Sequence, residues 1–87
     1  MNIKVAFINE TSDNKKEHVI LEEKLFENVK DRFDKEIIDY VYHKVVFELD
    51  PEYNFIDYDN CPYIAINYYD GDKQIYSDNC IEYMYNT

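Results

Sequence analysis

Acidic residues in the second half of the chain recur two positions apart at three places. These places are Glu48/Asp50/Glu52, Asp57/Asp59 and Asp70/Asp72. Residues two apart in extended backbone lie on one side of the chain, roughly 6.6 Å from each other. Two successive phosphate steps along one DNA strand cover a similar distance, roughly 6.8 Å. Carboxylates arranged in this way would imitate a phosphate track, which a protein with a basic nucleic-acid groove would recognise.

Tyrosines accompany these acids. Eight of the ten tyrosines follow residue 52, and they are Tyr53, Tyr58, Tyr63, Tyr68, Tyr69, Tyr76, Tyr83 and Tyr85. Tyrosine supplies broad, rigid contact area at binding hot spots. The sequence therefore predicts a partner-binding surface that combines acids with tyrosine anchors. Its candidate residues are Glu48, Asp50, Glu52, Tyr53, Asp57, Tyr58, Asp59, Tyr69, Asp70 and Asp72.

The net charge of −10 is concentrated in this same half. Residues 1–47 carry ten acidic and eight basic residues, whereas residues 48–87 carry nine acidic residues and one basic residue, Lys73. A field of one sign repels nucleic acid and acidic membranes and attracts basic protein surfaces. We therefore expect no direct binding to nucleic acid or membrane. The alternative is that the acids only keep a small protein soluble and mark the solvent faces of strands.

In size, charge and tyrosine content the chain resembles the small acidic DNA mimics encoded by phages, a class that includes anti-restriction and anti-CRISPR proteins. The resemblance implies a non-enzymatic inhibitor that binds the basic nucleic-acid-binding surface of a nuclease, polymerase or nucleoid protein. It also implies the cytoplasm of the host cell as the location. An interaction module or subunit with another type of target stays open as an alternative, and so does a homodimer.

Catalytic and metal-binding patterns are weak in this chain. Cys61 and Cys80 lie 19 positions apart, and His18 and His43 are scattered, unlike the paired spacing of zinc sites. A calcium loop with Gly71 at its sixth position lacks a carboxylate at its first position. Carboxylate pairs for glycoside hydrolysis would need a substrate cleft, for which 87 residues leave little room. We expect no enzymatic activity, no metal and no cofactor.

The chain predicts one domain spanning residues 1–87. Its N-terminus lacks the pattern of a signal peptide, and no apolar stretch approaches transmembrane length. Two cysteines do not make the disulfide framework of a small secreted protein. These observations favour the cytoplasm.

The first half predicts a strand followed by a helix. Ile3–Asn9 is a near-continuous apolar run, typical of a strand in the centre of a sheet. Polar residues 10–14 offer several helix N-caps, and Lys15–Phe33 is predicted as a helix. The helix prediction rests on an apolar stripe at four-residue spacing, formed by Leu21, Leu25, Val29 and Phe33.

The middle of the chain is ambiguous. Ile37–Leu49 is dense in β-branched and aromatic residues, which favours a strand from about Ile37 to Phe47. Ile37, Val41 and Val45 continue the four-residue spacing, so a helix remains the rival interpretation. Residues 50–60 are rich in turn formers and predict a loop or one helical turn.

The C-terminal third predicts a hairpin and a last element. Tyr63–Tyr69 alternates in polarity, Asp-Gly at 70–71 marks a tight turn, and Lys73–Tyr76 returns as the partner strand. Residues 77–79 favour a short capped helix at the end, with a strand as the alternative. The resulting fold class is α+β, in the order β-α-β-β-β-α, with one sheet packed on helix 15–33.

Proline, hairpin and capped helix together suggest one further resemblance. Pro62, the strand after it, the Gly71 turn and Ser77–Tyr85 resemble the C-terminal half of thioredoxin-like domains. The resemblance implies a cis bond before Pro62 that faces a redox site. The Cys-x-x-Cys of that family is missing, because residues 11–15 read TSDNK. A degenerate thioredoxin-like protein that uses Cys61 or Cys80 is therefore a further alternative.

Overall fold

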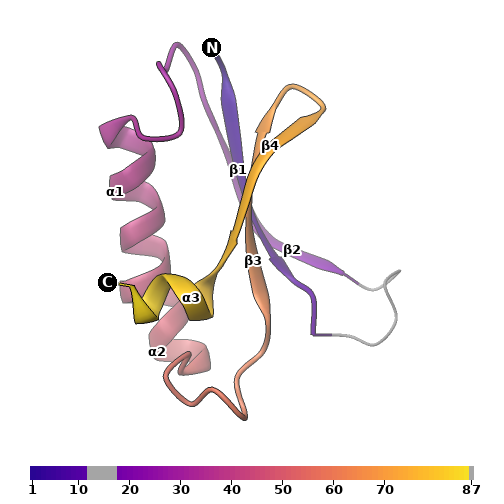
Figure 1. The fold of residues 1–87 in the computed structure, drawn as a ribbon, viewed down its shortest axis with the longest axis vertical. Coiled ribbons are helices and arrows are strands. Elements are labelled where there is room, and N and C mark those ends of the chain that lie inside the picture. Colours follow the sequence, from indigo (N-terminus) through magenta and orange to yellow (C-terminus); the bar gives the residue numbers. More distant parts are fainter. Residues whose placement is uncertain (12–17, 87) are drawn as a thin grey trace.

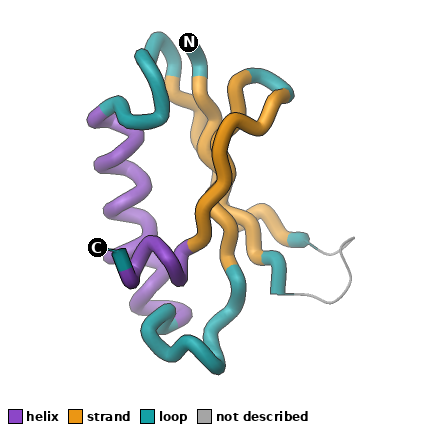
Figure 2. Tube along the Cα trace, in the orientation of Figure 1, coloured by secondary structure: helices purple, strands orange, loops and turns teal. Residues whose placement is uncertain are grey.

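The computed structural model describes residues 1–11 and 18–86, which form a four-stranded sheet and a layer of helices (Figures 1 and 2). The sheet is antiparallel throughout and has the order β2-β1-β3-β4. Its strands are β1 (Ile3–Asn9), β2 (Val19–Phe26), β3 (Ile64–Asp70) and β4 (Lys73–Asn79). The helices are α1 (Lys35–His43), η2 (Lys44–Leu49), α2 (Asp50–Tyr53) and α3 (Cys80–Tyr85). All of them lie on the same face of the sheet (Figure 1).

The core lies between these two layers. Alternate residues of the central strands point to the helices, and the buried ones are Ile3, Val5, Phe7, Ile64, Ile66 and Tyr68. The helical segment contributes one apolar residue every four positions, and these are Ile37, Val41, Val45 and Leu49. Both periodicities are the ones that a half-buried strand and an amphipathic helix require.

Residues 35–53 are helical, so the predicted strand from Ile37 to Phe47 is wrong and the rival interpretation is right. The Asp34 side chain accepts a hydrogen bond of 3.2 Å from the Glu36 N–H and caps the helix. Burial of the four-residue stripe against the sheet outweighs the strand preference of the β-branched residues.

The helix continues through Pro51 with a change of geometry. The Asp50 N–H bonds to the carbonyl of Val45, five residues back, which is π-helical bonding. Proline has no N–H to donate, and the final turn α2 begins around it. The helix ends at Asn54, which takes a left-handed conformation with φ of 53°.

The predicted helix Lys15–Phe33 is also wrong, because residues 19–26 form the edge strand β2. The apolar stripe does not lie on one face: Val29 is buried, whereas Leu25 and Phe33 are exposed. Pairing with β1 makes this segment a strand and outweighs the helical spacing of its apolar residues. The start of the predicted helix and part of its caps, at positions 12–17, lie outside the described residues.

The C-terminal predictions are confirmed. β3 and β4 form the hairpin, and Gly71 takes φ of 62° in the turn between them. The last element is helix α3, whose Asn79 cap accepts a hydrogen bond of 2.8 Å from the Glu82 N–H. The predicted α+β class with one sheet and a short C-terminal helix is therefore correct, with the long helix and the second strand exchanged in order.

The thioredoxin-like arrangement is not supported. Its first helix would occupy residues that form β2, and no described peptide bond is cis, including the one before Pro62. Among the described residues, no helix is long and apolar enough to cross a membrane.

Candidate partner-binding surface

The predicted acidic surface is divided between two ends of the molecule. The turn with Asp70 and Asp72 lies at one end of the longest axis (Figure 1). α2 and the loop 54–63, with Asp57 and Asp59, lie at the opposite end. The ten predicted residues therefore do not form one continuous face.

The phosphate-track geometry is also wrong for these residues. Glu48, Asp50 and Glu52 are helical, and helical residues two apart are separated by about 200° around the axis. The other two pairs lie in a loop and a tight turn, where extended spacing does not apply. Charge and tyrosine content remain as functional clues, whereas the regular spacing does not.

Three of the predicted acids are engaged within the chain. Glu48 lies 3.4 Å from Lys44 and 3.3 Å from His43. Asp50 accepts a 3.0 Å hydrogen bond from the Phe55 N–H and so fixes the start of the loop. The Asp57 carboxylate accepts from the Asn60 side chain at 3.1 and 3.2 Å.

Glu52 and Asp59 differ from these three acids. Both are exposed, and neither side chain makes a hydrogen bond or ion pair within the described part of the chain. A carboxylate without an internal partner keeps its full charge for an external one. Asp70 and Asp72 share these properties at the other end of the molecule, so Glu52 and Asp59 are the predicted acids at the end formed by α2 and the loop 54–63 that are best suited to contact another molecule.

The predicted tyrosines also divide. Tyr58 is 65% exposed. Tyr53 is half-buried, with its ring centroid 6.2 Å from that of Phe55, and it packs against the core. Tyr69 is half-buried on the sheet, where the Lys4 ammonium lies 5.1 Å from its ring. Tyr58 is therefore the only exposed side chain among these three predicted tyrosines.

Folding brings α3 beside the loop 54–63, and this adds residues that the sequence did not predict. Tyr85 packs edge-on against Tyr58, with 6.3 Å between ring centroids. A hollow of about 390 Å³ lies next to them, lined by Tyr58, Cys61, Tyr63, Asn79, Ile81 and Glu82. These side chains come from two segments about 20 positions apart, and no local spacing joins them.

We define the acidic end as residues 50–63 and 80–85. It contains five acids, Asp50, Glu52, Asp57, Asp59 and Glu82, and no lysine or arginine. Its exposed aromatic residues are Tyr58, Tyr63 and Tyr85. The same absence of lysine and arginine extends over residues 45–72 and 74–87, so the sequence alone does not single out these two segments.

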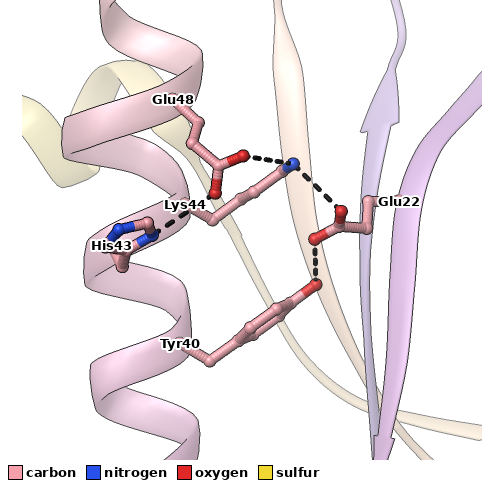
Figure 3. Close-up of polar contacts among 5 residues, drawn as sticks. All are labelled: Glu22, Tyr40, His43, Lys44 and Glu48. Carbon is pink, nitrogen blue, oxygen red and sulfur yellow. Dashed lines mark hydrogen bonds and ion pairs between the residues drawn. The ribbon is translucent and has the colours of Figure 1, made fainter.

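A second polar cluster links the sheet to the helix, and Figure 3 shows its geometry. The Glu22 carboxylate of β2 accepts a 2.6 Å hydrogen bond from the Tyr40 hydroxyl and lies 3.0 Å from the Lys44 ammonium. Lys44 also reaches Glu48 at 3.4 Å, and its side chain is only 13% exposed. We call the trio Glu22, Tyr40 and Lys44 the clamp.

Each pKa in the clamp moves away from neutrality. The hydrogen bond from Tyr40 lowers the pKa of Glu22, with Lys44 adding to the effect. Burial and then the Glu22 carboxylate raise the pKa of Tyr40. Burial opposes the charge of Lys44, but its bonds to Glu22 and Glu48 outweigh this and raise its pKa. The clamp therefore holds two fixed charges and a protonated hydroxyl, which suits a structural link better than proton transfer.

The cysteines do not form a reactive pair. Burial raises the pKa of Cys80 to about 12, so its thiol stays protonated. Cys61 is half-buried, with its sulfur 3.8 Å from the Phe55 carbonyl. Across residues 1–11 and 18–86, no group of three or more histidine, cysteine and acidic side chains is placed to hold a metal ion.

Comparison with known proteins identifies no relative of this chain. No protein-family model matches the chain, and neither a curated protein nor a solved structure shows significant similarity to it.

Proposed function

We propose that this protein is a non-enzymatic inhibitor whose acidic end binds the basic nucleic-acid-binding surface of another protein. The observation that supports it most is the composition of that end. Acids without internal partners, Glu52 and Asp59, lie among exposed tyrosines in segments that contain no lysine or arginine.

Electrostatics favours a basic partner for such a surface. Its field steers basic surfaces toward it and repels nucleic acid and other acidic molecules. Close charge pairs across an interface also select the partner, because acids left without a matching base are costly to desolvate. A groove that grips phosphates through lysine and arginine offers many such bases.

Tyrosine would supply the contact area that charge alone does not. The exposed rings of Tyr58 and Tyr85 pack against each other, which limits their conformational freedom before binding. Ordered aromatic side chains lose little entropy on binding and are common hot spots. The proposed interface is therefore an aromatic centre surrounded by carboxylates.

Two charge-reversal variants of equal charge test this proposal. The first replaces Glu52→Lys and Asp59→Lys at the acidic end, and the second replaces Asp70→Lys and Asp72→Lys at the opposite end. Each variant and the wild type is immobilised and exposed to a bacterial lysate, with and without a competing DNA duplex. The net charge changes equally in both variants, so a difference between them depends on where the charge was changed.

We expect the wild type to capture a protein that the duplex displaces. The first variant should bind this protein about 100-fold more weakly, and the second should bind it within about fivefold of wild type. Retention should also fall steeply with added salt, because the pairing is electrostatic. Capture that the duplex does not reduce would favour a basic target of another type and contradict the proposal. Equal loss in both variants would show that net charge alone acts.

A further inference from the structure

The hollow at the acidic end has the composition of a site for a cationic side chain. Tyr58 and Tyr63, which are 65% and 45% exposed, and Glu82 are among the residues that line it. The Glu82 side chain makes no hydrogen bond or ion pair within the described residues, while its backbone N–H is held by Asn79. The carboxylate is thus on a fixed backbone and available.

Rings and a carboxylate around one hollow favour a cation for two separate reasons. The faces of tyrosine rings attract a cation within about 6 Å of their centres. The carboxylate adds charge pairing, which is strongest when both of its oxygens accept hydrogen bonds. The lining contains no lysine or arginine that would repel or replace the incoming cation.

Arginine fits this combination better than lysine. Its flat guanidinium stacks on a ring and presents two parallel N–H groups to a carboxylate at the same time. The lysine ammonium is a compact, strongly hydrated point charge that gains less from stacking. A hollow of about 390 Å³, open to solvent, has room for a flat group and part of its aliphatic stem.

We propose that this hollow is an arginine subsite, in which Glu82 pairs with the guanidinium while Tyr58 and Tyr63 stack against it. The subsite deepens the proposed function and rests on it for its biological occupant, an arginine of the basic partner. The binding chemistry itself is testable without that partner.

The test uses three short blocked peptides as probes: acetyl-Gly-Arg-Gly-amide, its citrulline analogue and its lysine analogue. Citrulline keeps the shape of arginine and lacks its charge. Each peptide is titrated into the ¹⁵N-labelled full chain, and amide chemical shifts are followed. We expect saturable shifts at Cys61, Tyr63, Ile81 and Glu82 with the arginine peptide, at least about threefold weaker binding with lysine, and none with citrulline.

Paired variants locate the contacts. Glu82→Gln and Tyr58→Leu should each weaken arginine binding about threefold or more. Glu27→Gln and Tyr69→Leu make matched changes outside the hollow and outside the acidic end, and they should leave the affinity for the arginine peptide within about 1.5-fold of wild type. The amide spectrum of each variant checks that the fold is kept.

The outcomes separate this inference from the proposed function. Equal binding of arginine, lysine and citrulline, or shifts confined to the Asp70–Asp72 turn, would overturn the arginine subsite. Arginine binding in the hollow, with no partner that a DNA duplex displaces, would keep the subsite and refute the proposed function. If Glu82→Gln and Tyr58→Leu still capture a partner that the DNA duplex displaces, as well as the wild type does, only the subsite would be refuted.

Discussion

The clamp and the acidic end use the same residue types in opposite ways. In the clamp, Glu22 meets a lysine at 3.0 Å and a tyrosine hydroxyl at 2.6 Å. At the acidic end, the side chains of Glu52, Asp59 and Glu82 make no hydrogen bond or ion pair with a described residue, and exposed tyrosines belong to the same two segments. Acids that are paired inside the chain stabilise the fold, and acids that are not paired remain available to a partner.

The acidic end nevertheless has a fixed backbone. Phe55 is fully buried in the core, and its N–H bonds to the Asp50 side chain. The Asp57 carbonyl accepts backbone hydrogen bonds from Asn60 and Cys61, both at 3.0 Å. Mutually repelling acids are thus held on a loop that the core anchors, and water and salt screen the repulsion because Glu52, Asp57 and Asp59 are exposed.

Phe55 is the residue that anchors this loop in the core, so its removal tests the anchor. Phe55→Ala should lower the free energy of unfolding by about 3–5 kcal/mol, because a fully buried aromatic side chain leaves a cavity. Urea unfolding followed by circular dichroism measures the change. Ile56→Ala is the control, since Ile56 is 65% exposed and should cost less than about 0.5 kcal/mol. Similar losses in the two variants would mean that the loop is not anchored through Phe55.

Removing one hydroxyl tests the clamp. Tyr40→Phe should lower the free energy of unfolding by about 1–2 kcal/mol, because Glu22 loses a hydrogen bond to its charged oxygen while the ring packing is kept. Tyr85→Phe removes a hydroxyl at the acidic end and should change stability by less than about 0.5 kcal/mol. If Tyr85→Phe costs as much as Tyr40→Phe, the two regions do not differ in the way proposed.

The clamp should also make stability depend on acid pH. Folding lowers the pKa of Glu22, so the stabilisation is complete above its unfolded pKa of about 4.5 and is lost as pH falls through the lower folded value. Glu22→Gln should therefore be less stable than wild type at pH 7, and the difference should shrink as the pH falls below about 4.5. Thermal unfolding at a series of pH values measures this difference.

A double variant provides the control for that experiment. Tyr40 gives the largest contribution to the lowered pKa of Glu22. The difference between glutamate and glutamine at position 22 should thus be smaller, and vary less with pH, in a Tyr40→Phe background. An unchanged difference in that background would contradict the coupling.

Sequence patterns predicted the hairpin and α3 well, because their signals are local. Gly71 supplies the positive φ of a tight turn, and Asn79 supplies a cap three residues before Glu82. The segments 15–33 and 37–47 were assigned the wrong conformations. β2 is an edge strand whose pairing with β1 is not visible in its own residues, and the apolar spacing of the long helix competed with its β-branched composition.

The sequence predicted which residue types make up the candidate site, but not where on the fold they gather. Charge and tyrosine content indicated an acidic, aromatic surface, and Glu52, Tyr58 and Asp59 remain in it. Glu82 and Tyr85 join them only because α3 folds back beside the loop 54–63, which depends on the topology of the whole sheet. Asp70 and Asp72 drop out for the same reason, since the hairpin carries them to the other end (Figure 1).

Neutralising Glu52 and Asp59 separates a role in binding from a role in folding. Glu52→Gln with Asp59→Asn removes two charges that repel their neighbours, so the free energy of unfolding should rise or stay within about 0.5 kcal/mol of wild type. Raising sodium chloride from 0.05 to 0.5 M should stabilise the wild type more than this variant, because salt screens a repulsion that the variant partly lacks. A loss above about 1 kcal/mol, or an equal salt response, would show that these acids support the fold. Weaker partner binding at unchanged stability would instead show that these two acids contribute to binding and not to folding.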